Sequence, residues 1–318
     1  MDNLIDLILL KYNLNVVKIN TFQKGYRNRS YLLDLVDGSQ VNLIIYKQEI
    51  GILAKIKAAH KFSVQLNDAG LNVRHPINKI LKLKENYYAC LYNYLSGKTI
   101  PWESYTMNHL KLLGEELNRV HFIGSQTQIV ENFNLESNNL RLIIARMQSY
   151  FEREDVEVAL ISKLKIGLNL NKFLNYSIQI VYKVENYNTK SFLHMDFVRG
   201  NILFEDEPKL HISGIIDFEK ADYGTPLFDL ARTFAFLLVD CKYKSELEIR
   251  KYFLKSGYIK NGKLKLDSYK YLNELTTIYL IYDFYKFLQH NPYEFLKTNE
   301  HYIRTQNMLI SLRLLNKI

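Results

Sequence analysis

The segment Phe192–Glu219 constrains the fold more than any other part of the chain, because short apolar runs alternate in it with polar loops. The pattern predicts a strand, a tight polar loop, a second strand, a turn, a third strand and an acidic turn. Four polar side chains fall at the strand ends: His194, Asp196 and Asn201 in the loop, and Asp217 after the third strand. The segment therefore predicts polar groups that project from strand ends into a shared crevice.

These residue types suit the transfer of a phosphoryl group from ATP. One carboxylate, here Asp196, positions the attacking hydroxyl and accepts its proton, while the Asn201 amide oxygen and the Asp217 carboxylate hold magnesium ions. The spacing H-x-D-x-x-x-x-N, with Asp217 sixteen residues after Asn201, matches the catalytic loop and metal-binding turn of kinases. Taken singly, each of the three is also common in solvated turns, which is the alternative interpretation.

The strings HMDFVRGNIL and GIIDFEKADYGTPLFDLA resemble the aminoglycoside phosphotransferase and choline kinase superfamily of small-molecule kinases. Met195 stands where that superfamily usually has glycine. The resemblance implies an α+β, bilobal, protein-kinase-like fold, with a small antiparallel-sheet N-lobe containing one helix and a larger, mostly helical C-lobe. It also implies a cytoplasmic transferase that uses ATP and Mg²⁺, and whose partners are a nucleotide and a small-molecule hydroxyl acceptor.

Further residues of this region receive roles from the resemblance and from chemistry. Arg199 is expected to neutralise the transferring phosphoryl group, with a substrate carboxylate or solvent as the alternatives. His194 is expected to support the loop by hydrogen bonding. Asp229 resembles an aspartate that braces the catalytic loop, although Asp is also a common helix cap. Glu219 is a weaker candidate for contact with the metals or the substrate.

The remaining pattern predicts two domains, an N-lobe at residues 1–95 and a C-lobe at residues 96–318, with a hinge at Asn93–Thr99. Helical spacing after Met107 predicts a helical C-lobe. The predicted N-lobe elements are a helix at 2–12, strands at Val16–Phe22, Ser30–Leu35 and Val41–Lys47, a helix at Gly51–Asp68, and a hairpin of Ile77–Leu83 with Tyr87–Tyr92.

The turn at residues 23–31 resembles the G-x-x-N-x-x-Y turn that covers the nucleotide in this superfamily. We expect Gly25, Asn28 and Ser30 to reach the phosphate oxygens, with a plain hairpin turn as the alternative. Adenine is expected to lie against backbone groups of the hinge, for which Tyr92 and Leu95 are the named candidates.

The third strand departs from the superfamily. Ile44 stands at the usual basic position, and Ala59 belongs to the helix stretch where an acidic partner is common. Lys47 is a predicted phosphate contact, but it lies one strand face away unless a bulge shifts the register. The other candidates for a displaced base are Lys24, Arg27 and Arg29. The alternative is weak nucleotide binding by a non-catalytic, pseudokinase-like regulator.

The chain carries a net charge of +9, and residues 241–318 hold 14 Lys and Arg against 7 Asp and Glu. The basic residues are interspersed with apolar ones at helical spacing, which favours a solvated helical surface, so a nucleic-acid partner is not expected. The two cysteines are far apart in apolar contexts and predict buried thiols. No apolar run is long enough to cross a membrane, and the acidic start does not resemble a secretion signal.

Overall fold

The structure is a computed structural model and describes residues 2–21, 28–47, 49–83, 87–126, 133–164 and 169–311. It separates into two compact units. The first unit comprises Met1–Thr99 and Asn201–Ala221, and the second comprises Ile100–Gly200 and Asp222–Ile318. This division differs from the expected boundary at residue 95, chiefly because a segment from the middle of the expected C-lobe belongs to the first unit.

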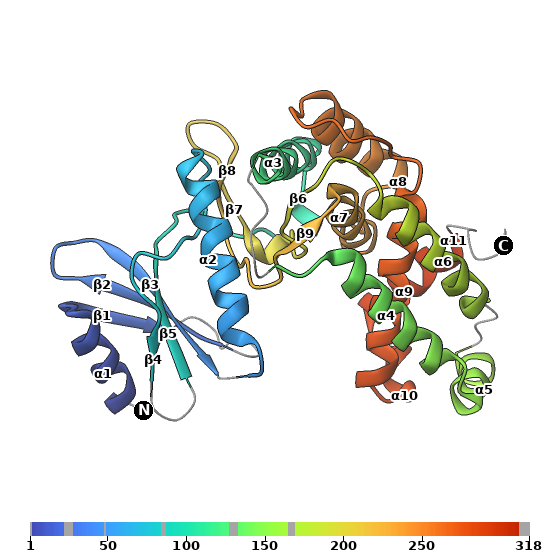
Figure 1. Cartoon of the computed structure of the whole chain (residues 1–318), viewed down its shortest axis with the longest axis horizontal. Helices are drawn as coiled ribbons and strands as arrows, with labels where there is room; N and C mark the ends of the chain where they lie inside the picture. The colour runs from blue at the N-terminus through green and yellow to red at the C-terminus, as the bar shows by residue number, and fades with distance from the viewer. Residues whose placement is uncertain are drawn as a thin grey trace. The chain divides into compact units, whose positions relative to one another are not determined.

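An antiparallel sheet in the order β1-β2-β3-β5-β4 forms the centre of the first unit (Figure 1). Its strands are β1 (Val16–Thr21), β2 (Arg29–Leu35), β3 (Gln40–Lys47), β4 (Leu81–Lys82) and β5 (Tyr87–Asn93). The strand expected at Ile77–Leu83 is therefore reduced to two residues. Upstream of β4, Ile77 bonds to Leu91 of β5, and the Asn78 side chain then accepts from the next backbone N–H, which interrupts a regular ladder.

Helices cover the two faces of this sheet, as Figure 1 shows. Helix α1 (Asp2–Tyr12) packs Ile8 against one face, in a cluster that contains Leu43 and Ile45. Helix α2 (Ile52–Asp68) packs Ile56 against the other face, in a cluster that contains Ile44. Because side chains alternate along β3, the strand is buried on both faces.

The hairpin of β7 (Ile202–Glu205) and β8 (His211–Ile215) belongs to the first unit because its backbone bonds there. Phe204 exchanges two hydrogen bonds with Lys98, at 3.1 and 3.0 Å. Ile215 pairs in parallel with Val73, and the Arg74 N–H donates to the Ile215 carbonyl at 2.8 Å. The hairpin thus extends the first unit at both of its strands.

The second unit is mostly helical, which together with the first unit confirms the α+β fold. The two short strands β6 (Ser191–Leu193) and β9 (Asp222–Gly224) pair within it. Its helices and helical turns are η2 (Trp102–Ser104), α3 (Met107–Ser125), α4 (Glu136–Phe151), α5 (Glu154–Ser162), α6 (Leu170–Glu185), α7 (Pro226–Asp240), α8 (Glu246–Ile249), the π-helical η4 (Arg250–Lys260), α9 (Leu272–His290), α10 (Tyr293–Leu296) and α11 (Glu300–Ser311). The short turn η3 (Arg199–Asn201) begins in the second unit and ends in the first, where it leads into β7. Among the described residues, no helix combines the length and the apolarity that crossing a bilayer requires.

Candidate active site

A buried carboxylate shapes the loop that follows β6 in the second unit. Asp229, in the first turn of α7, accepts the backbone N–H of His194 at 2.6 Å and that of Met195 at 3.0 Å. His121 Nε2 lies 3.0 Å from the same carboxylate, and Asp229 is fully buried. Met195 adopts a left-handed backbone with φ of 58°, a conformation that favours glycine. The bracing contact that was expected of Asp229 is therefore present.

Asp196 follows in this loop and is half-buried. Its backbone N–H donates to His194 Nδ1 at 3.3 Å, and its carbonyl accepts the Val198 N–H at 2.8 Å. The His194 side chain thus supports the loop by hydrogen bonding, as expected. Burial opposes the charge of Arg232, but Asp283, with a smaller contribution from Asp196, holds the pKa of this guanidinium above its ordinary value. Asp196 therefore lies within electrostatic reach of a buried cation of its own unit.

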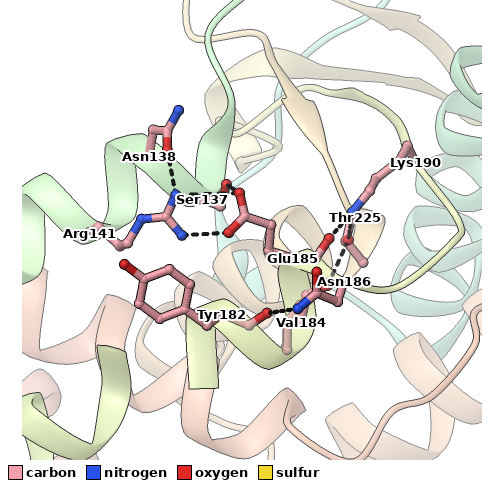
Figure 2. Close-up of polar contacts among 9 residues, drawn as sticks. All are labelled: Ser137, Asn138, Arg141, Tyr182, Val184, Glu185, Asn186, Lys190 and Thr225. Atoms are coloured by element: carbon pink, nitrogen blue, oxygen red, sulfur yellow. Dashed lines mark hydrogen bonds and ion pairs between the residues drawn. The ribbon is translucent and has the colours of Figure 1, made fainter. Parts of the chain in front are cut away.

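A second polar network fixes the start of the helix that carries Asp229 (Figure 2). The Lys190 ammonium donates a hydrogen bond to the hydroxyl of Thr225, the residue before α7, at 3.3 Å. It also donates to the Glu185 carbonyl at the end of α6. Arg141 of α4 forms an ion pair with the Glu185 carboxylate. Three helices are tied together in this way, four residues ahead of Asp229 in the chain.

Arg199 is exposed and lines a polar pocket of about 140 Å³ in the second unit. The pocket is also lined by Trp102, Glu103, Asp240, Glu300, His301 and Arg304. Its three acids, Glu103, Asp240 and Glu300, come from separate segments, so no local pattern indicates that they lie together. A larger groove of about 450 Å³ lies on α4 and α9 and contains no residue of the loop after β6.

The two candidate metal ligands flank the β7–β8 hairpin of the first unit. Asn201 precedes β7 and is 8 % exposed, while Asp217 follows β8 in a left-handed conformation with φ of 65°. The Ile216 N–H donates to the Asn201 carbonyl at 2.9 Å, which joins the two ends of the hairpin. An amide oxygen and a carboxylate are hard ligands of the kind Mg²⁺ uses together with phosphate oxygens. Among the described residues, no group of three or more His, Cys, Asp or Glu is placed to hold a metal ion, and a site completed by phosphates does not need one.

The expected phosphate-binding turn is only partly described, since Gly25 lies outside the described residues. The Asn28 amide donates to both carboxylate oxygens of Glu219, at 3.1 and 3.2 Å. Ser30 pairs with Ile44 across β2 and β3, so the two side chains share a sheet face. Asn28 therefore contacts the acidic turn after β8.

Neutral hydrogen-bonding groups surround Ile44 on this face. The Tyr92 hydroxyl lies 2.8 Å from the Tyr46 hydroxyl and 2.8 Å from His60 Nε2. Burial lowers the pKa of His60 to about 4, and burial raises the pKa values of both tyrosines, so the group is uncharged near neutral pH. The Tyr92 side chain is thus engaged in the interior. Within the described residues the backbone of Leu95 forms no hydrogen bond, and its contact with adenine stays a prediction.

A family model of the phosphotransferase enzyme family matches residues 18–240, and the chain belongs to this family. No curated protein matches it. Its fold is similar to that of the amicoumacin kinase hAmiN, solved with AMP-PNP, Ca²⁺ and amicoumacin, at a TM-score of 0.72 and 15 % identity over 97 % of this chain and 91 % of that one. It is also similar to aminoglycoside 2'-phosphotransferase-IIIa, solved with GDP, at a TM-score of 0.63 and 14 % identity over 99 % of this chain and 98 % of that one. A third similar structure is the macrolide 2'-phosphotransferase MphH from Brachybacterium faecium, at a TM-score of 0.63 and 14 % identity over 97 % of each chain.

Proposed function

We propose that this protein is an ATP- and Mg²⁺-dependent phosphotransferase that moves the γ-phosphoryl group to a hydroxyl of a small molecule. The observation that carries the proposal is the buried Asp229 carboxylate, which accepts two backbone N–H groups of the loop bearing Asp196. Membership of the phosphotransferase family supports the reaction class. A loop held in this way presents a carboxylate without needing reorganisation during the reaction.

In the proposed reaction, Asp196 orients the acceptor hydroxyl and takes its proton as the oxygen attacks the γ-phosphorus. The new oxygen–phosphorus bond replaces the bond to the β–γ bridging oxygen, ADP leaves, and Asp196 releases its proton to solvent. Asn201 and Asp217 would hold Mg²⁺, which when bound neutralises the charge of the phosphates. Arg199 is proposed to contact the transferring phosphoryl group or an anionic part of the acceptor.

The proposed acceptor class rests on the solved structures that share this fold. Solved structures with this fold include an amicoumacin kinase, an aminoglycoside phosphotransferase and a macrolide phosphotransferase, all of which act on antibiotics by their names. The pocket beside Arg199 adds no open acidic site to this argument, because Lys242 already pairs with Glu103 and Glu300, and His301 pairs with Asp240. We therefore propose that hydroxylated molecules of these classes come first in a screen for the acceptor.

The test is Asp196→Ala, assayed by Mg²⁺-dependent ADP release across hydroxylated metabolites and antibiotics. Removal of a general base commonly costs about 10²- to 10⁴-fold in rate. We expect kcat to fall by this factor while calorimetry shows unchanged ATP affinity. Asp206→Ala, which removes an exposed carboxylate between β7 and β8, is the matched control and should leave turnover unchanged. Full turnover by Asp196→Ala would exclude Asp196 as the base.

A second candidate function is a non-catalytic nucleotide-binding regulator. The apolar contacts of Ile44, which faces Cys90 across β3 and β5, favour it because the usual phosphate-binding base is missing there. Nucleotide binding by the wild type without ADP release for any acceptor would support this candidate against the first.

A further inference from the structure

The resemblance to small-molecule kinases implies a basic residue at position 44, on the sheet face expected to receive the nucleotide phosphates, and this chain has Ile44 there. Ile44 lies in an apolar cluster with Ile56 of α2 and Cys90 of β5. Ala59, on the same helix, is buried and carries no acid. A triphosphate brought to this face would therefore meet no base from the third strand, and phosphoryl transfer depends on such charge neutralisation.

Two candidate replacements lie on the opposite face of the sheet. Arg29 pairs with Ile45, and its guanidinium lies 5.9 Å from the centre of the Tyr87 ring. Lys47 pairs with Tyr87, and its side chain is exposed. The pairings of β2 with β3 and of β3 with β5 are both continuous, so no bulge turns either side chain toward Ile44. The other two candidates, Lys24 and Arg27, lie outside the described residues.

Arg74 reaches this region from a different segment. Its backbone N–H donates to the Ile215 carbonyl at 2.8 Å, and Ile215 precedes Asp217 by two residues. The next residue, His75, accepts the Asn93 N–H at 3.2 Å at the end of β5. The backbone of Arg74 is therefore held between β8 and β5, beside the turn that presents Asp217.

The side chain of Arg74 is partly exposed, but its Nε is buried and is an unfilled donor. Its Nε has no hydrogen-bond partner among the described residues. Burial lowers the pKa of Arg74, and this is opposed by Tyr46, Asp217, Tyr92 and Glu219, so all four lie within electrostatic reach of the guanidinium. Two of them belong to the group around Ile44, and one is the proposed magnesium ligand. A buried donor that lacks an acceptor is costly, and phosphate oxygens match the planar donors of a guanidinium well.

We propose that Arg74 binds the phosphate oxygens of the nucleotide and so replaces the basic residue that Ile44 displaces from the third strand. The inference rests on the proposed function, because it assigns a residue to the same nucleotide. It also gives a reason for the neutral surroundings of Ile44: a lysine there would place a second cation beside Arg74, and like charges at close range repel.

The experiment compares ATP, ADP, AMP and adenosine, each with Mg²⁺, in calorimetric titrations of the wild type and Arg74→Met. Loss of charge-assisted hydrogen bonds should raise the Kd for ATP by about 10- to 100-fold. The Kd for adenosine should stay unchanged, because adenosine has no phosphate. Lys18→Met removes an exposed cation on β1 of the same unit and is the matched control, with no change expected for either ligand.

A rescue variant tests the shared location of the two side chains. Ile44→Lys in the Arg74→Met background should restore most of the lost ATP affinity, because it returns a cation to the usual position. Unchanged ATP affinity in Arg74→Met, or equal losses for ATP and adenosine, would overturn the assignment of Arg74.

Failure of the proposed function gives a different result, because a wild type that binds neither ATP nor adenosine contradicts both proposals at once. If Arg74→Met does not fold, a crystal structure of the wild type with AMP-PNP and Mg²⁺ decides. A hydrogen bond from the guanidinium to a phosphate oxygen supports the proposal. A separation beyond about 4 Å from every phosphate oxygen overturns it.

Discussion

His60 gives the first unit a defined response to acid. Burial lowers its pKa from 6.5 to about 4, and its Nε2 lies 2.8 Å from the Tyr92 hydroxyl. The unfolded chain therefore binds a proton near pH 6.5 that the folded chain does not accept until about pH 4. The free energy of unfolding should be undiminished above pH 6.5 and should fall as the pH drops from 6.5 toward 4.

The size of this acid effect is bounded at about 3 kcal/mol, because each pKa unit is worth about 1.36 kcal/mol, and partial solvation of the ring reduces it. His60→Gln keeps a polar side chain but does not titrate, so it should flatten the pH dependence. Urea unfolding at about pH 7 and pH 4.5 measures the difference. Equal losses of stability in the wild type and the variant would show that other groups are responsible.

Residues in one contiguous motif could be placed from the sequence, and residues brought together by folding could not. The bracing of the loop by Asp229 and the support from His194 were expected, and the hydrogen bonds to Asp229 confirm the first. The roles of Asp196, Asn201 and Asp217 stay predictions. Arg74 gave no local signal, because its neighbours come from β3, β5 and the turn after β8.

Two glycines allow α3 to lie close to η4 in the second unit. A Cβ added at Gly114 would meet the Phe253 carbonyl oxygen at 2.1 Å and the Tyr258 nitrogen at 2.7 Å. Both are backbone atoms, so they cannot move aside independently. A Cβ at Gly257 would likewise meet the Lys111 carbonyl oxygen at 2.5 Å. The contact between these two helices therefore depends on the absence of side chains at both positions.

Gly114→Ala should destabilise the protein although alanine favours helices. Alanine gains about 1 kcal/mol in helix propensity over glycine. Overpacking costs about 1–3 kcal/mol, and a clash with fixed backbone lies at the upper end of this range, so the cost of overpacking exceeds the gain. We expect Tm to fall by several degrees in calorimetry. Gly224→Ala is the matched control, since the nearest atom to its added Cβ is 3.6 Å away. An unchanged Tm for Gly114→Ala would contradict the close contact.

Elements with strong periodicity were predicted within a few residues, and elements set by tertiary pairing were not. Helix α2 was expected at Gly51–Asp68 and is observed at Ile52–Asp68. The strand expected at Ile77–Leu83 shrank to β4 because the preceding backbone bonds irregularly to β5. The helical C-lobe predicted from spacing contains two helix types, since α8 is followed directly by the wider turns of η4. Periodicity does not distinguish these helix types.

At the scale of the whole molecule, the chain passes between the two units three times, after Thr99, after Gly200 and after Ala221. The sequence predicted one crossing near residue 95, because nothing in the local pattern of the β7–β8 hairpin shows that its backbone pairs with residues more than a hundred positions earlier. Neither unit can therefore be separated by a single cut. The two candidate metal ligands, Asn201 and Asp217, both lie in the short returning segment.

This connectivity predicts that fragment 1–99 is incomplete without segment 201–221. Four backbone hydrogen bonds join them: two between Lys98 and Phe204, and two that connect Ile215 with Asn72 and Arg74. Since unpaired buried backbone groups are costly, fragment 1–99 alone should lose cooperative urea unfolding. The same fragment joined to 201–221 should regain cooperative unfolding. A linker of about eight glycine and serine residues is long enough to join Thr99 to Asn201, because Lys98 already bonds to Phe204. A fragment carrying segment 201–221 in scrambled order is the control. Circular dichroism measures the urea midpoint of each polypeptide. Equal midpoints for all three would show that the first unit folds without the returning hairpin.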